Sequence, residues 1–172
     1  MAAVTHKGTA VHTSGELPRV GSKAPDFLLT KGDLSDVRIA DFAGKVLILS
    51  IVPSLDTSTC ALSAKKFDAE AAKLEGVLVL NVSRDLPFAQ ARFCKAEGVE
   101  TVIPLSDLRD RSFGRAYGVE LLDGRLAGLL SRSVVVVDAS GKVVYTQLVP
   151  EISTEPDYAS ALEAAKRAVA AA

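Results

Sequence analysis

The stretch that most constrains this chain runs from Lys45 to Val52, which reads KVLILSIV and is almost continuously apolar. A strand that is covered on both faces has this pattern, because helices pack against each side of such a sheet. Pro53 ends the strand by removing a backbone donor, and residues 56–58 (DTS) are all types that cap helices. The sequence therefore predicts a central strand that leads directly into a helix.

Cys60 lies where this helix begins. The apolar residues that follow have the spacing of one helical face, namely Cys60, Ala64, Phe67, Ala71 and Leu74. With Asp56 or Thr57 as the cap, Cys60 falls in the first turn, where unpaired N–H groups and the helix dipole favour a thiolate. An inward cysteine on a helix is more often inert packing, so a reactive thiol and a core residue are both open interpretations.

Four further apolar segments predict strands of the same sheet. Val77 to Val82 follows the first helix and is expected to pair in parallel with the first strand. Ser131 to Asp138 and Val143 to Val149 flank the tight turn ASGK, which predicts an antiparallel hairpin. Val99 to Leu105 is a shorter strand candidate.

Two more long helices are expected, besides a short one within Asp107 to Tyr117. The first is predicted to have Asp85 as its cap, Pro87 in its first turn and Gly98 at its end, with Cys94 near that end. The last helix begins after Glu155, and its expected buried face is Tyr158, Leu162, Ala165 and Val169. Two crossover helices that each carry one cysteine are expected on the same side of the sheet.

This order of elements predicts the α/β class. A β-α-β half followed by a β-β-α half around a mixed central sheet, flanked by helices, is the thioredoxin-like fold. Short alternating stretches between Val4 and Val20 predict an N-terminal β-hairpin that covers one end of the core and has little functional content. We expect residues 1–172 to form a single domain, with residues 1–20 as the hairpin extension.

Composition excludes several classes of function. A net charge of -1 and a pI near 6.1 give no electrostatic reason to expect nucleic acid or an anionic membrane as a partner. The start, MAAVTHKGTAV, lacks the layout of a secretory signal, and no apolar run approaches the length of a membrane span, so we expect a cytoplasmic protein. Besides two cysteines, only His6 and His12 could bind zinc, and neither has ligand spacing, so no metal is expected.

Pro53, Thr57 and Cys60 form the pattern P-x-x-x-T-x-x-C, which resembles the active-site motif of the peroxiredoxins. Over nearly its full length the chain is similar to their thiol peroxidase subfamily, the atypical two-cysteine peroxiredoxins. The stretches that carry this resemblance are PSLDTSTC, SRDLPFAQARFC, SRSVVVVD and the N-terminal hairpin. Ser58 and Thr59 differ from the residues common in the subfamily, which affects the rim of the pocket rather than the motif.

The resemblance implies a role for each site residue. Cys60 would attack hydrogen peroxide or an organic hydroperoxide, and Cys94 would resolve the oxidised product as an intramolecular disulfide, which thioredoxin reduces. Thr57 would orient the thiolate and the peroxide, Arg132 would supply a fixed cation, and Pro53 would shield the sulfur from water. The family uses no cofactor and is usually a homodimer. The alternatives are that Thr57 only caps the helix and that Arg132 only faces solvent.

Two other functions are compatible with such a cysteine pair. One is a general thiol-disulfide oxidoreductase, which the fold permits, although the chain has no C-x-x-C. The other is a non-enzymatic redox sensor that uses the same disulfide.

Overall fold

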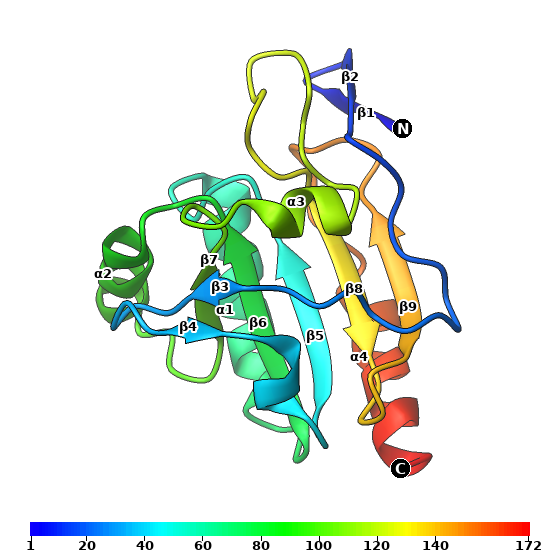
Figure 1. Cartoon of the computed structure of the whole chain (residues 1–172). Coiled ribbons are helices and arrows are strands. Elements are labelled where there is room, and N and C mark those ends of the chain that lie inside the picture. The colour runs from blue at the N-terminus through cyan, green and yellow to red at the C-terminus, as the bar shows by residue number, and fades with distance from the viewer.

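A computed structural model describes all residues, Met1–Ala172, as a sheet with helices on its faces (Figure 1). The strands are β1 (Ala3–His6), β2 (Thr9–His12), β3 (Leu29–Thr30), β4 (Asp36–Val37), β5 (Val46–Ile51), β6 (Val77–Ser83), β7 (Ile103–Ser106), β8 (Ser133–Val137) and β9 (Val143–Leu148). The helices are α1 (Ser58–Ala71), α2 (Pro87–Glu97), α3 (Ser112–Ala116) and α4 (Tyr158–Ala170), with a 3₁₀ helix, η1, at Ile39–Phe42.

The main sheet has seven strands in the order β4-β3-β7-β6-β5-β8-β9. Strand β5 pairs in parallel with β6 and antiparallel with β8, and β8 pairs antiparallel with β9. These pairings confirm the predicted parallel unit and hairpin. The mixed sheet with flanking helices confirms the thioredoxin-like α/β fold.

The apolar strands face two separate cores. On β5, Leu47, Leu49 and Ile51 contact one cluster, whereas Val46 and Ile48 contact the other, as the two-residue period of a strand requires. This explains why the segment reads as continuously apolar. A strand with only one covered face would alternate between apolar and polar residues.

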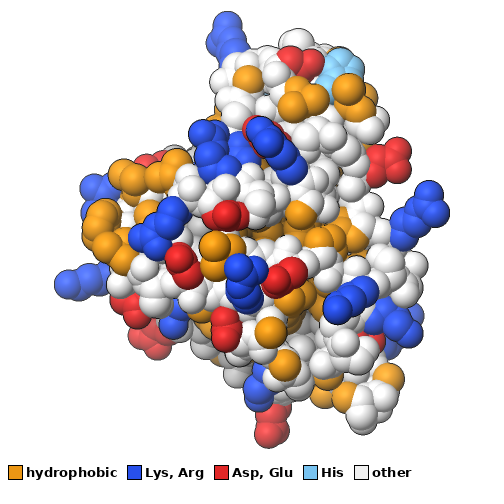
Figure 2. Space-filling view, viewed as in Figure 1, with side chains coloured by type: hydrophobic (Ala, Val, Ile, Leu, Met, Phe, Trp, Pro, Cys, Tyr) orange, Lys and Arg blue, Asp and Glu red, His pale blue; other side chains and the backbone are white.

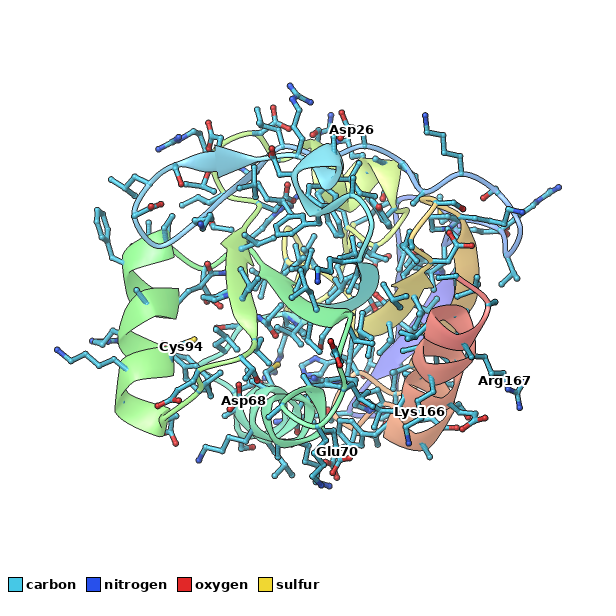
Figure 3. All side chains as sticks on the ribbon, turned by 90° about the horizontal axis from the view of Figure 1, so that it is seen from below. Asp26, Asp68, Glu70, Cys94, Lys166 and Arg167 are labelled. Carbon is cyan, nitrogen blue, oxygen red and sulfur yellow. The ribbon has the colours of Figure 1, made fainter.

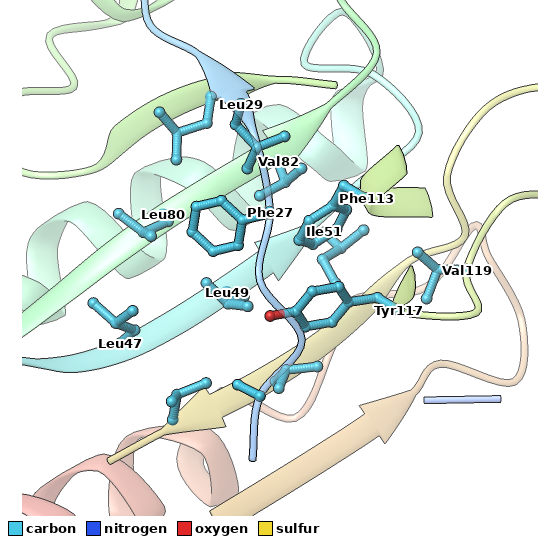
Figure 4. Packing of buried hydrophobic residues seen from close by; sticks show 14 of the residues in the cluster. Phe27, Leu29, Leu47, Leu49, Ile51, Leu80, Val82, Phe113, Tyr117 and Val119 are labelled. Atoms are coloured by element: carbon cyan, nitrogen blue, oxygen red, sulfur yellow. The ribbon is translucent and has the colours of Figure 1, made fainter. Parts of the chain in front are cut away.

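One core is closed by the segment before β3 and by α3 (Figure 4). There Phe113 and Tyr117 stack with ring centroids 4.3 Å apart, and Phe27 meets Phe113 edge-on at 6.0 Å. The other core is closed by α1 and α4, which lie behind the sheet in Figure 1, and by part of α2 at its edge. The buried residues of α1 are Cys60, Ser63, Ala64, Phe67 and Ala71, which confirms the predicted inward face up to Ala71. The helix ends there, so Leu74 lies outside it and packs against the core only partly buried.

Several local predictions were wrong. Asp85 does not cap α2, because the N-cap is Leu86 and no side chain bonds there; Pro87 and Gly98, which has a φ of 65°, hold their predicted positions. Strand β7 begins at Ile103 rather than Val99, whose side chain instead packs in the core. On α4 the last inward residue is Ala168, while Val169 is 37% exposed.

The N-terminal hairpin, β1-β2, forms a separate two-stranded sheet beyond the carboxyl ends of β5 and β6 (Figure 1). Lysine, arginine, aspartate and glutamate side chains are interspersed on the face seen in Figure 2, without a large area of one sign. None of the helices combines the length and the apolar character needed to cross a bilayer.

Candidate active site

Cys60 sits in the first turn of α1, directly after the loop that follows β5. Thr57 is the N-cap, and its Oγ1 accepts a hydrogen bond from the backbone N–H of Cys60 at 3.2 Å. The Cys60 side chain is fully buried (0% exposed). The cap prediction is therefore confirmed for Thr57, and the sulfur lies at the positive end of the helix, where a negative charge is stabilised.

Arg132 brings a cation to this sulfur from a distant part of the sequence. Because Ile51 pairs with Ser133 in the β5-β8 ladder, Arg132 lies beside the carboxyl end of β5. Its Nη2 donates to Cys60 Sγ at 3.2 Å, and its Nε donates to the carbonyl of Ile152 at 2.8 Å. The site thus places a buried cation with an N–H donor in direct contact with the sulfur.

One donor of Arg132 is still available. The side chain is only 2% exposed, and its Nη1 has no hydrogen-bond partner in the protein. A buried polar group without a partner is costly, so it marks a place where a ligand oxygen would be bound.

A pocket of about 280 Å³ opens above these groups. It is lined by His6, Lys7, Pro53, Thr57, Ser58, Thr59, Leu126, Arg132, Ile152 and Ser153. Pro53, Thr57 and Arg132, predicted from the sequence as site residues, thus share one cavity next to the buried sulfur. Ser58 and Thr59, predicted to affect the rim, line the same cavity.

Sequence reasoning missed the contribution of the N-terminal hairpin. Glu151 accepts hydrogen bonds from Thr5 Oγ1 at 2.8 Å, from Lys7 N at 3.0 Å and from Gly8 N at 3.1 Å, and these hold the hairpin against the pocket. The N–H of Ser153, together with these three donors, keeps the pKa of the Glu151 carboxyl far below its usual range. No local signal could predict this contact, because the hairpin and Glu151 lie at opposite ends of the chain.

Cys94 lies on the side of α2 that faces α1, near Asp68 (Figure 3), and both cysteines are free thiols in this structure. Asp68 is about two turns, roughly 12 Å, beyond Cys60 along α1. A disulfide needs Cα atoms within about 7 Å. The structure therefore does not bring Cys94 to Cys60, and a bond between the two sulfurs requires the backbone to move.

Burial, and secondarily the charge of Asp68, raises the pKa of the Cys94 thiol. A thiol that holds its proton more tightly in the folded chain makes folding less favourable once the unfolded chain can ionise. We therefore expect the free energy of unfolding to fall as pH rises through about pH 8 to 9, the usual thiol range. Denaturant unfolding of the reduced protein and of Cys94→Ser across this range measures the effect. The free energy of unfolding of the reduced wild-type protein, relative to that of Cys94→Ser, should fall as pH rises over this range. A difference that stays constant with pH would contradict the expectation.

Comparisons with known proteins identify the family of this chain. The family model described as Redoxin matches residues 19–162. A thiol peroxidase of Mycobacterium bovis is 56% identical over 164 residues, which cover 95% of this chain and 98% of that protein. A thiol peroxidase of Leptospira interrogans is 50% identical over 171 residues, which cover 98% of this chain and 100% of that protein.

Solved structures are also similar over nearly the full length. A peroxiredoxin-like protein from Aquifex aeolicus is 40% identical, with a TM-score of 0.92 and 98% of each chain covered. A thiol peroxidase from Chromobacterium violaceum matches with a TM-score of 0.90 at 21% identity, covering 99% of this chain and 98% of that one, which shows the shared fold. This chain therefore belongs to the redoxin family and, within it, to the thiol peroxidase group of peroxiredoxins.

Proposed function

We propose that this protein reduces hydroperoxides with Cys60 as the attacking thiol and Cys94 as the resolving thiol. The Cys60 thiolate attacks one oxygen of the peroxide, the O–O bond breaks, and the departing oxygen leaves as an alkoxide or hydroxide that takes up a proton. Sulfur is oxidised to sulfenic acid, and the peroxide is reduced to an alcohol or water. Thiol-dependent peroxide reduction is the activity of the family to which the chain belongs.

The observation that carries this proposal is the contact of Arg132 with Cys60 Sγ at 3.2 Å, with Nη1 still unpaired. One N–H group would hold the thiolate while the other binds a peroxide oxygen. Negative charge grows on the departing oxygen in the transition state, so a donor aimed there is worth more than in the ground state. The Thr57 hydroxyl lines the pocket and makes a long bond of 3.3 Å to the Ser54 carbonyl, and it would turn from that carbonyl to donate to the same peroxide.

The pocket supports organic hydroperoxides as well as hydrogen peroxide. Its volume of about 280 Å³ far exceeds that of a small peroxide, since a water molecule occupies about 30 Å³ in the liquid. Pro53, Leu126 and Ile152 offer apolar contacts within it. A series of kcat/KM values for hydrogen peroxide and for alkyl hydroperoxides of increasing size ranks these substrates.

In the second step the Cys94 thiolate attacks the sulfur of the Cys60 sulfenic acid. An S–S bond forms, the S–O bond breaks, and the oxygen leaves as water after protonation. Because Cys94 lies near Asp68 and the two thiols are unbonded in this structure, we expect the first turn of α1 to unwind for this step. A thioredoxin-type dithiol then reduces the exposed disulfide. Different conformations of residues 53–60 in the reduced and disulfide forms would support this sequence, and identical backbones would exclude it.

Replacement of Cys94 by serine separates the two steps. We expect the variant to consume one equivalent of peroxide at the wild-type rate, and its turnover with thioredoxin and thioredoxin reductase to fall by about tenfold, because thioredoxin must then attack a buried sulfenic acid. Peroxide consumption in single and multiple turnovers is the measurement. Unchanged steady-state turnover would contradict a resolving role for Cys94.

The same assay distinguishes the rival functions. A general thiol-disulfide oxidoreductase would reduce disulfide substrates without consuming peroxide. A redox sensor would be oxidised once and would not be recycled by thioredoxin.

We further propose that the chain is a single domain that acts in the cytoplasm, where a reducing environment keeps its two thiols free, and that it forms a homodimer as the resemblance to peroxiredoxins implies. Light scattering of the reduced and disulfide forms tests the oligomeric state. A monomer in both forms would exclude the dimer.

A further inference from the structure

Asp85 lies at the junction between β6 and α2, and its carboxylate bonds to the loop that leads to Cys60. Oδ1 accepts a hydrogen bond from Ser54 Oγ at 2.6 Å, and Oδ2 accepts one from the backbone N–H of Leu55 at 2.8 Å. Oδ2 also accepts from Ser83 Oγ at 2.7 Å. The residue that the sequence suggested as a helix cap thus connects the entrance of α2 to the entrance of α1.

From Ser54 the connection continues to the reactive sulfur. The carbonyl of Ser54 accepts hydrogen bonds from both the N–H and the hydroxyl of Thr57, each at 3.3 Å. Thr57 in turn caps the N–H of Cys60. Asp85 therefore acts on Cys60 only through the shape of the loop and has no contact with the reacting atoms.

From Ser83 the hydrogen bonds continue toward the helix that carries the second cysteine. Ser83 Oγ accepts a hydrogen bond from Gln90 Nε2 at 2.9 Å, and the same Nε2 donates to the carbonyl of Leu105 at 2.9 Å. Gln90 is the buried residue of α2, one turn before Cys94 and on the same face of the helix. One hydrogen-bonded chain thus links the segments that carry the two cysteines.

We propose that Asp85 is a positioning residue that acts as a latch: it holds the loop before Cys60, residues 52–57, in the closed conformation that this structure shows. It thereby sets the relative rates of Cys60 oxidation and disulfide formation. The inference rests on the proposed function, in which Cys60 is oxidised and Cys94 resolves it. Attack on peroxide needs the closed loop, because in that conformation Arg132 donates to the sulfur and Thr57 caps the N–H of Cys60. Disulfide formation needs the open loop, because the two cysteines are otherwise too far apart. A latch on the loop favours the first step and restrains the second.

The test is the variant Asp85→Asn, which preserves shape but replaces one of the two acceptor oxygens with an –NH2 group, so that the bond from Ser54 or the bond from Leu55 is lost. Hydrogen bonds to a carboxylate are stronger than those to an amide, so the closed loop loses stability. We expect oxidation of Cys60 to slow by about threefold and disulfide formation after oxidation to accelerate by about tenfold. A disrupted active site would slow oxidation without accelerating disulfide formation. Disulfide formation that is unchanged or slower in Asp85→Asn would overturn the proposal.

The chain has no tryptophan, so the rates are best followed by rapid quenching, thiol trapping and mass spectrometry. The same samples report overoxidation, in which the sulfenic acid takes an oxygen from a second peroxide to give sulfinic acid and water or an alcohol. Faster disulfide formation leaves less sulfenic acid exposed to this reaction. At high peroxide the sulfinic fraction of Asp85→Asn should fall by severalfold, and an equal or larger fraction would count against the latch.

Asp138 provides a matched control. Its Oδ1 accepts hydrogen bonds from Ser140 N at 2.9 Å, Ser140 Oγ at 2.6 Å and Lys142 N at 2.9 Å, in the turn at the far end of β8 from Arg132. Asp138→Asn should leave both steps at wild-type rates. If it accelerates disulfide formation as much as Asp85→Asn, the effect is general loosening and the latch is excluded.

Ser54→Ala gives a second variant in case Asp85→Asn does not fold. It removes one of the three bonds to the carboxylate, so disulfide formation should accelerate by about threefold, and the absence of acceleration would overturn the proposal. The wild-type protein tests the proposed function separately. If peroxide does not oxidise its Cys60, the proposed function fails, whereas normal oxidation without acceleration in the variants rejects only the latch.

Discussion

Replacement of Cys60 by serine is expected to abolish peroxide turnover, with kcat/KM reduced by about 10⁴-fold or more. A serine hydroxyl is not ionised near neutral pH, and its oxygen cannot be oxidised to a sulfenic acid. No other thiol is placed to replace it, because Cys94 lies in α2, near Asp68 and away from Arg132. The assay is peroxide consumption with thioredoxin and thioredoxin reductase.

The fold should survive this substitution. Serine is similar in size to cysteine, and its hydroxyl can bond to Arg132 Nη2, which now donates to Cys60 Sγ at 3.2 Å. Thermal unfolding of Cys60→Ser should therefore stay close to that of the wild type. A folded Cys60→Ser protein that retained turnover would remove the assignment of Cys60 as the attacking thiol.

Replacement of Arg132 by glutamine is expected to lower kcat/KM for peroxide by about 10² to 10³-fold. The substitution removes the buried charge beside Cys60 and the fork of donors, of which Nη1 is unpaired. Arg132→Lys keeps a charge but not the planar fork, so an intermediate loss of about tenfold is expected. Initial rates at several peroxide concentrations give kcat/KM for both variants.

Alkylation of Cys60 by iodoacetamide distinguishes the two contributions of Arg132. Alkylation needs the thiolate but no donor for a leaving oxygen. If Arg132 binds the peroxide as well as stabilising the thiolate, Arg132→Gln should slow the peroxide reaction more than the alkylation. Equal losses would restrict its role to the thiolate, and wild-type peroxide rates would exclude any role.

Arg132→Gln also removes the bond from Nε to the Ile152 carbonyl, so some loss of stability is expected, on the order of 1 kcal/mol. Unfolding curves must accompany the kinetics. If Arg132→Gln is folded at the assay temperature, its lower rate is due to the change in the active site and not to unfolding.

Much of the fold could be predicted because its signals are local. The nearly continuous apolar runs of β5 and β6 require two covered faces, and Pro53 with Thr57 defines where α1 begins. Predictions of where a helix begins were wrong where tertiary contacts competed with a local preference. Asp85 is a good helix cap in isolation, but Ser54, Leu55 and Ser83 offer its carboxylate three partners elsewhere.

The chain alone thus determined the order of strands and helices and the place of Cys60 in the first turn of a helix, since hydrophobic periodicity and capping act between residues a few positions apart. Tertiary structure decided which distant groups meet there: Arg132 on the sulfur, the hairpin at the pocket, and Cys94 held away from Cys60. These contacts join segments separated by tens of residues. They arise from the pairing of strands and the packing of helices, which no short stretch of sequence encodes.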